Sequence, residues 1–338
     1  MIRKFVLGGV VLLSSLAGLT AAFVLWGVYE RPHVAGTEPV LFRVETGESF
    51  AAVTRRLGDR GLIAHRKPLA LYAGLRRLDR RIKVGTYGLQ PGTRPKDILY
   101  KLVTGDVYKV PVTIPEGFMH SEIAGALAAA AAVDSVAFAS LLRDSTLLAE
   151  FGIEGPSLEG YLFPDTYVIP WDSPAREIAA VMVRRLSEVL DRDVLARAER
   201  LGMTRRELLT LASIVEAETR LPEELPLVSA VYHNRLQKGM RLEADPTVAY
   251  AMGGYRGRLL FRDLAIDSPY NTYQRAGLPP GPICNPGEAA IRAALEPDST
   301  CKAIYFVARG DGSHVFSLNL RDHRAAVREA RRARLSSQ

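Results

Sequence analysis

The sequence predicts an α+β protein in which a single N-terminal transmembrane helix precedes a small module and a larger mixed α+β domain. Residues 5–29 contain no charged side chain. Residues 41–108 alternate short strands with helices, and residues 110–330 place several helices before a late strand hairpin. That order is typical of α+β folds and not of a doubly wound sheet. The length of 338 residues also suits about two domains.

The N-terminal segment is predicted to span a membrane once. Its apolar run, residues 5–29, exceeds the ~20 residues that a helix needs to cross a bilayer. Arg3 and Lys4 precede the run, so residues 1–4 are expected to stay in the cytoplasm. The bulk of the chain is then expected on the opposite, periplasmic or extracytoplasmic side of the cytoplasmic (inner) membrane. A cleaved signal peptide is the alternative, because residues 20–22 are small. Its apolar core would usually be only ~7 to 15 residues long.

A linker and a compact module are expected to follow the span. Residues 30–40 are rich in proline and glycine and are interpreted as a linker. Over residues 41–108 the pattern predicts a strand, a helix that ends before Gly58, a second helix, a second strand and a third helix that ends at Gly105. The order of strand, helices and strand resembles a LysM-like carbohydrate-binding module.

The larger domain is expected over residues 110–330. It begins with a strand and a turn, which lead into an alanine-rich helix. A hairpin near its end pairs AIYFVAR with VFSLN around the turn GDGSH. The helices are predicted at residues 123–133, 175–190, 193–201, 205–219 and 223–236.

Composition excludes several classes of function. The net charge of +7 is spread through mixed runs such as RLDRRIK and REARRARL. These runs are interpreted as solvated surface, with contact to anionic lipid or to a carboxylate-bearing polymer as the alternative, and no nucleic-acid partner is expected. The histidine and cysteine spacings fit no metal site, so neither a metal nor a cofactor is expected. Cys284 and Cys301 lie in the exported part, where a disulfide between them is permitted.

Two acids, Glu216 and Glu218, stand at the end of an apolar helix. Residues 204–207 have the form of a capping box, which predicts the start of this helix. On a helical wheel Glu218 falls within the apolar arc and Glu216 at its edge. Both carboxyl groups are therefore expected to point toward the protein body, whereas the opposite face carries Thr210, Ser213 and Ala217.

A carboxyl group among aliphatic side chains is a candidate general acid. Burial penalises its charged form, so its pKa rises and it keeps a proton near neutral pH. The structural alternative is that the two acids pair with basic side chains such as Arg235 or Arg241. No nucleophile elbow, phosphate-binding loop or dinucleotide fingerprint competes with this chemistry.

Two polar segments near residues 232–250 and 268–290 are candidate substrate-binding loops. They combine amide and hydroxyl groups with aromatic rings, a mixture that suits sugars. Asp245-Pro246 and Asn285-Pro286-Gly287 are also interpreted as turns. The candidate substrate-binding residues are Asn234, Arg241, Asp245, Thr247, Tyr270, Asn271, Thr272 and Tyr273.

Five long motifs complete the pattern: LEGYLFPDTYVIP, ASIVEAET, VYHNRLQKGMRLEADPTVAYAMG, SPYNTYQRAGLPPGPICNPG and YFVARGDGSHVFS. In this order, behind one N-terminal anchor, they resemble the YceG-like (MltG) family of endolytic murein transglycosylases. The resemblance implies cleavage of the β-1,4 bond between MurNAc and GlcNAc in nascent peptidoglycan strands, without water, to leave 1,6-anhydroMurNAc ends. Such cleavage terminates or trims strand elongation.

The resemblance also implies residue roles and partners. The essential acid of the family aligns with Glu218, which would act as general acid and base, and Glu216 is its support or the alternative acid. The partners would be glycan strands and, through the anchor, a penicillin-binding protein or another glycan polymerase. A hydrolytic muramidase and a non-catalytic, membrane-tethered peptidoglycan-binding scaffold are the rival readings.

Overall fold

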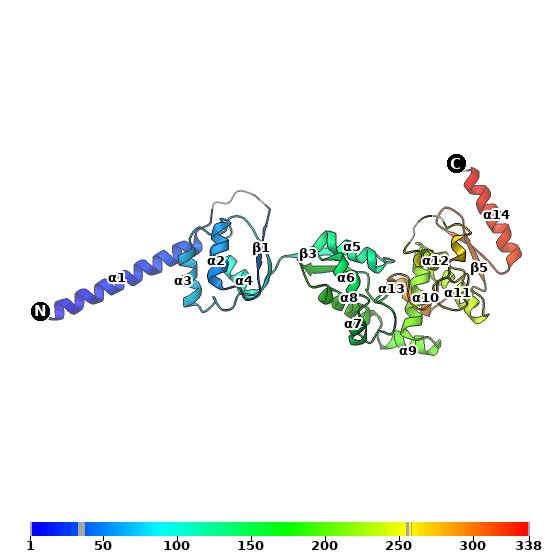
Figure 1. Cartoon of the computed structure of the whole chain (residues 1–338), viewed down its shortest axis with the longest axis horizontal. Helices are drawn as coiled ribbons and strands as arrows, with labels where there is room; N and C mark the ends of the chain where they lie inside the picture. The colour runs from blue at the N-terminus through cyan, green and yellow to red at the C-terminus, as the bar shows by residue number, and fades with distance from the viewer. Residues whose placement is uncertain (1, 33–37, 255–256, 258, 337–338) are drawn as a thin grey trace. The chain divides into compact units, whose positions relative to one another are not determined.

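The computed structural model describes residues 2–32, 38–254, 257 and 259–336. The chain divides into two compact units, Met1–Val110 with Ile169–Asp172, and Pro111–Val168 with Ser173–Gln338, whose elements are labelled in Figure 1. Each unit mixes helices with a few strands, which confirms the α+β class. Residue 1 of the expected cytoplasmic tail and residues 33–37 of the expected linker lie outside the described residues.

The first unit begins with α1 (Ile2–Tyr29), a continuous helix. Within it, Gly8–Tyr29 is long and apolar enough to cross a membrane, with a mean hydropathy of 2.0. Its last turns pack on the module: Val28 is fully buried, and a Cβ atom on Gly27 would lie 2.4 Å from Pro68. The C-terminal end of α1 is therefore part of the module, and membrane topology itself stays a prediction.

The module is a two-stranded sheet covered by three helices, α2 (Phe50–Asp59), α3 (Arg66–Leu75) and α4 (Pro95–Thr104). The strands β1 (Val40–Val44) and β2 (Gly85–Leu89) run antiparallel and place Phe42 opposite Tyr87. Both rings are buried together with apolar residues of all three helices.

Two helix ends test the sequence interpretation of the module. α2 runs through Gly58 to Asp59, so the predicted end before Gly58 is wrong. Gly58 is the penultimate residue of α2. Even inside a helix a glycine costs only ~1 kcal/mol, and the buried Leu57 in the same turn offsets that cost. α4 ends as predicted, at Gly105, whose φ of 76° is the left-handed conformation that glycine adopts readily.

The larger unit is mainly helical. β3 (Lys109–Thr113) pairs with β4 (Thr166–Pro170), and the boundary between the two units falls within both of these strands. β5 (Tyr305–Ala308) pairs antiparallel with β6 (His314–Ser317). The helices between and after these strands are α5 (His120–Ala131), α6 (Ser135–Leu141), α7 (Ser145–Glu150), α8 (Ala175–Val189), α9 (Arg192–Arg200), α10 (Arg205–Glu218), α11 (Leu225–Gln237), α12 (Asp245–Ala251), α13 (Glu288–Leu295) and α14 (Leu320–Ser336), with short 3₁₀ turns at Pro222–Glu224 and Asp263–Ala265.

Helix α10 lies at the centre of this unit. The predicted capping box is present: Glu207 N donates to Thr204 Oγ1 over 3.2 Å, and Thr204 N donates to the Glu207 carboxylate over 2.8 Å. The predicted outward orientation of Thr210 and Ser213 is wrong, because both are buried. Neighbouring elements, including α9, α11, α12 and α13, pack around α10, and Ser213 Oγ accepts a hydrogen bond from Ile283 N at 3.0 Å.

Several elements were not expected. Asp245-Pro246 begins α12 and does not form a turn, since proline is well tolerated in the first turn of a helix. α13 and α14 also form where no helix was predicted. In the described part of the chain no disulfide joins Cys284 to Cys301. The Cys284 Sγ atom instead lies 3.3 Å from Ser213 O.

Candidate active site

A cavity of about 440 Å³ opens beside the C-terminal end of α10, and Glu218 lines it. Its walls come from α10, α11, the start of α12, the loop that follows residue 268, the β5–β6 hairpin and α14. The side chains that line it include Glu218, Tyr232, Arg235, Glu243, Asp245, Tyr273, Phe306 and His314.

The surroundings of Glu218 bring the pKa of its carboxyl group close to neutral pH. Burial raises the pKa of Glu218 to about 7; the hydrogen bond from the Tyr232 hydroxyl to Glu218 Oε1 opposes the rise, the Asp245 charge adds to it, and Arg235 opposes it. A pKa near neutrality lets one group donate a proton and then take one back. Glu218 therefore has the property that a combined general acid and base requires.

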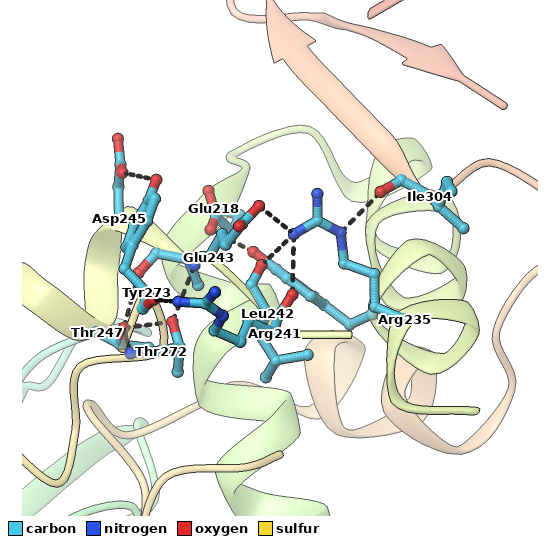
Figure 2. A network of polar contacts seen from close by, with 12 residues as sticks. Glu218, Arg235, Arg241, Leu242, Glu243, Asp245, Thr247, Thr272, Tyr273 and Ile304 are labelled. Carbon is cyan, nitrogen blue, oxygen red and sulfur yellow. Dashed lines mark hydrogen bonds and ion pairs between the residues drawn. The ribbon is translucent and has the colours of Figure 1, made fainter. Parts of the chain in front are cut away.

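Arg235 supplies a fixed positive charge at this cavity. Its side chain is only 8% exposed and donates to Ile304 O over 2.7 Å and to Leu242 O over 2.8 Å, and it pairs with Glu243 over 3.1 Å. Figure 2 shows the guanidinium held between these groups. The suggested pairing of Arg235 with the two acids is thus replaced by a pairing with Glu243.

A second carboxylate, Asp245, stands in the same cavity at the first residue of α12. The Tyr273 hydroxyl donates to Asp245 Oδ1 over 2.6 Å. Burial and this hydrogen bond raise the pKa of Tyr273, so its hydroxyl stays protonated and acts as a donor. Arg241 supports the same loop by donating to Tyr273 O over 2.5 Å, as Figure 2 shows.

Glu216 leaves α10 toward different surroundings. Its Oε2 atom accepts a hydrogen bond from Gly287 N over 3.0 Å, and a Cβ atom on Gly117 would lie 3.6 Å from its Cγ atom. Burial raises the pKa of Glu216, the Gly287 N–H lowers it, and the charge of Glu116 raises it. Glu216 is not among the side chains that line the cavity of Glu218.

Comparison with known proteins identifies the family of this chain. The model of the YceG-like family matches residues 42–329. The chain belongs to the YceG-like family. A relative in Bacillus subtilis (strain 168), named endolytic murein transglycosylase, is 32% identical over 305 residues, which cover 85% of this chain and 83% of the relative.

Two further proteins extend the comparison. An endolytic murein transglycosylase of Streptococcus pneumoniae (serotype 2, strain D39) is 29% identical over 85% of this chain, and the match spans 57% of that relative. A crystal structure of a YceG-like protein from Listeria monocytogenes has a TM-score of 0.59 and 30% identity, and the match covers 86% of this chain and 99% of that chain.

In this YceG-like chain several predicted binding residues build the framework of the site. Thr247 and Thr272 are buried, and their hydroxyl oxygens lie 2.8 Å apart. Asn271 is also buried and donates to Leu264 O and Ile266 O. Asn234 donates to Cys301 O and Ala303 O, so all of these side chains hold backbone segments in place.

The predicted residues thus fall into three groups. Glu218, Asp245 and Tyr273 meet in one cavity, and Arg241 reaches it through the backbone of Tyr273. Tyr270 lines a different cavity. The remaining predicted residues line neither cavity: Asn234, Thr247, Asn271 and Thr272 make the hydrogen bonds given above, and Glu216 bonds to Gly287 N. Their part in substrate binding stays a prediction.

Sequence reasoning missed the wall that the β5–β6 hairpin contributes. Glu224 accepts hydrogen bonds from His314 N over 2.9 Å and pairs with His314 Nδ1 over 2.6 Å, which ties the hairpin to the segment after α10. The Phe306 ring packs edge-on against Tyr232, with ring centroids 5.9 Å apart. His314 lies in the motif YFVARGDGSHVFS, next to the predicted turn. That position was the one feature of the sequence that could have indicated a functional residue in the hairpin.

Proposed function

We propose that this YceG-like protein is a membrane-anchored endolytic peptidoglycan transglycosylase. It cleaves the β-1,4 bond between MurNAc and GlcNAc in nascent glycan strands and leaves 1,6-anhydroMurNAc ends. The observation that carries the proposal is Glu218, a carboxyl group with a pKa of about 7 in an open cavity. The names of the relatives from Bacillus subtilis and Streptococcus pneumoniae support the same reaction.

In the proposed mechanism Glu218 handles both protons of the reaction. Its protonated carboxyl donates to the glycosidic oxygen as the C1–O bond breaks, and the GlcNAc unit leaves as an alcohol. The C6 hydroxyl of the same MurNAc then bonds to C1, and its proton passes to the Glu218 carboxylate. No water enters, and Glu218 ends in the state in which it began.

The neighbouring side chains have supporting roles in this mechanism. The Tyr232 hydroxyl donates to Glu218 Oε1 and orients the other oxygen toward the strand. Arg235 limits the rise in the pKa of Glu218, which keeps the carboxylate form accessible for the second proton transfer. Asp245 is positioned to accept hydrogen bonds from the hydroxyl groups of the strand, and the Tyr273 hydroxyl to donate one to it.

A second candidate reaction is hydrolysis by a muramidase. Hydrolytic glycosidases use two carboxyl groups, one as acid and one as nucleophile or base. Asp245 lies in the same cavity as Glu218 and could fill the second role. In the transglycosylase reaction the tethered C6 hydroxyl makes this second carboxylate unnecessary as a nucleophile.

The N-terminal unit is proposed to bring the enzyme to its substrate. α1 would span the cytoplasmic membrane once, with its N-terminal end in the cytoplasm, as Arg3 and Lys4 favour. The LysM-like module would bind glycan at its cavity of about 770 Å³, which is lined by Ser49 and Phe50 among other residues. Strands that emerge from a glycan polymerase or penicillin-binding protein would meet both units.

Product analysis tests the proposal. The full-length protein in detergent would be incubated with purified peptidoglycan strands, and the products would be analysed by mass spectrometry. We expect anhydro-ended fragments, each one water lighter than a hydrolysis product, and their loss in Glu218→Gln with retention in Glu216→Gln. Reducing ends that disappear in Asp245→Asn would establish the hydrolytic reaction instead. Strand binding without cleavage would leave the non-catalytic scaffold.

A further inference from the structure

A second cavity of about 560 Å³ lies in the larger unit and has no part in the proposed chemistry. Tyr250 and Tyr270 form an aromatic pair on its wall, with ring centroids 4.9 Å apart. Arg143, in the turn between α6 and α7, lines the same cavity with an exposed side chain. Aromatic faces beside a guanidinium suit a ligand that carries both a sugar ring and an anionic group.

The polar wall of this cavity is held in place by buried groups. Glu159 is only 2% exposed; it pairs with the His120 ring and accepts hydrogen bonds from His120 N and Asn285 Nδ2, each over 3.0 Å. His120 also lines the cavity. Burial raises the pKa of Tyr250 and Tyr270, the charge of Glu159 adds to that rise, and the positive charge of Arg143 acts against it. Arg143 and both tyrosines line the same cavity.

The two cavities share their supporting elements. α12 has Asp245 in the Glu218 cavity at one end and Tyr250 in the second cavity near the other. The rise along α12 from Asp245 to Tyr250 is about 7.5 Å, which is within the length of a disaccharide. The loop after residue 268 likewise contributes Tyr270 to one cavity and Tyr273 to the other.

We propose that the second cavity binds another muramyl unit of the same glycan strand, away from the bond that is cut. The sugar face packs on the Tyr250–Tyr270 pair, and a carboxylate of the attached stem peptide pairs with Arg143. The inference rests on the proposed function of the Glu218 cavity. It gives a physical reason for cleavage within strands, because binding energy at a distant unit favours long substrates over short ones.

Substrate length tests this inference. The full-length protein would be assayed on stem-peptide-bearing strands of increasing length, and KM and kcat would be measured at each length. Arg143→Gln is expected to raise KM for long strands by about 10-fold, the value of one charge-assisted contact, with kcat unchanged. For short strands, and for strands stripped of stem peptides, the variant and the wild type should have the same KM. Arg184→Gln, an exposed arginine on α8 that lines neither cavity, is the matched control.

The possible results separate the inference from the proposed function. Equal KM values for Arg143→Gln and wild type at every length would overturn the inference while leaving cleavage intact. An increase of the same size on stripped strands would overturn the assignment of Arg143 to a stem-peptide carboxylate. If the wild type cuts no strand, the proposed function fails, and equilibrium binding of long strands to Glu218→Gln with and without Arg143→Gln still tests the second cavity.

Discussion

Glu216 and Glu218 leave the same last turn of α10, yet they enter two different environments. Glu218 lines a cavity beside a hydroxyl donor, a second carboxylate and a fixed guanidinium. Glu216 lies against the backbone at Gly117 and accepts a hydrogen bond from Gly287 N. Burial is the largest cause of the raised pKa of both groups.

A raised pKa alone therefore does not identify a general acid. A catalytic carboxyl group also needs an open path to a substrate and neighbours that stabilise each protonation state in turn. Glu218 has both, whereas the hydrogen bond to Glu216 ties a backbone segment to α10. Substitutions that change the surroundings of one acid at a time test this difference.

The largest expected effect is the loss of activity in Glu218→Gln. The amide keeps the size of the side chain but cannot donate or accept the transferred proton, so kcat should fall by about 10³-fold, within the range for general acid–base groups. Release of anhydro-ended fragments from strands measures it. If Glu218→Gln keeps its activity, another residue is the general acid, and the different surroundings of Glu216 and Glu218 do not decide which of them acts.

The next effect concerns stability, because the raised pKa of Glu218 has a cost in free energy. The folded protein holds this proton up to about pH 7, whereas the unfolded chain releases it near its ordinary value of 4.5. The folded state is therefore favoured below pH 4.5, and this contribution is lost as the pH rises through about 7. The difference amounts to ~3 kcal/mol.

Glu218→Gln should remove that contribution to the pH dependence. Urea unfolding of the two proteins at pH 5 and pH 8 would be compared, with Glu216 present in both as a common background. Relative to wild type, the variant should gain stability as the pH increases. An identical pH dependence in the two proteins would mean that the Glu218 carboxyl titrates near its ordinary pKa.

A smaller effect is expected from Tyr232→Phe. Its hydroxyl donates to Glu218 Oε1 and thereby lowers the pKa of that carboxyl. Without it the pKa should rise above about 7, so the alkaline limb of the pH–rate profile moves to higher pH, and kcat falls by about 10-fold as orientation is lost. Tyr273→Phe removes the hydrogen bond to Asp245 but leaves the hydrogen bond from Tyr232 to Glu218 in place. It should therefore shift the alkaline limb of the pH–rate profile less than Tyr232→Phe does.

Particular residues show how far the sequence could predict this site. The capping box at Thr204 and Glu207 located the start of α10, and the apolar residues after it indicated that Glu218 is buried. The helical wheel could not separate Glu216 from Glu218, because it divides a helix into one buried and one exposed face. α10 is packed around most of its circumference, so its surroundings depend on tertiary contacts between distant segments.

The same limit applies to the neighbours of Glu218 and to the predicted binding residues. The Tyr232 hydroxyl bonds to Glu218 because α11 packs against α10, and no local pattern encodes that contact. Asn271 and Thr272 are predicted to bind substrate because their segment combines amide and hydroxyl groups with aromatic rings, a mixture that suits sugars. They are buried here since the loop uses their side chains to satisfy its own backbone.

The smallest expected effect is that of Glu216→Gln, and it completes the comparison. The glutamine oxygen can still accept the hydrogen bond from Gly287 N, so the contact between α10 and that segment is kept. The substitution removes a buried charge that the charge of Glu116 opposes. At pH 8 the variant should therefore be at least as stable as wild type, by up to about 1 kcal/mol, with kcat within about twofold. Thermal unfolding and the cleavage assay measure both. A large fall in kcat with stability unchanged would show that Glu216 takes part in the chemistry.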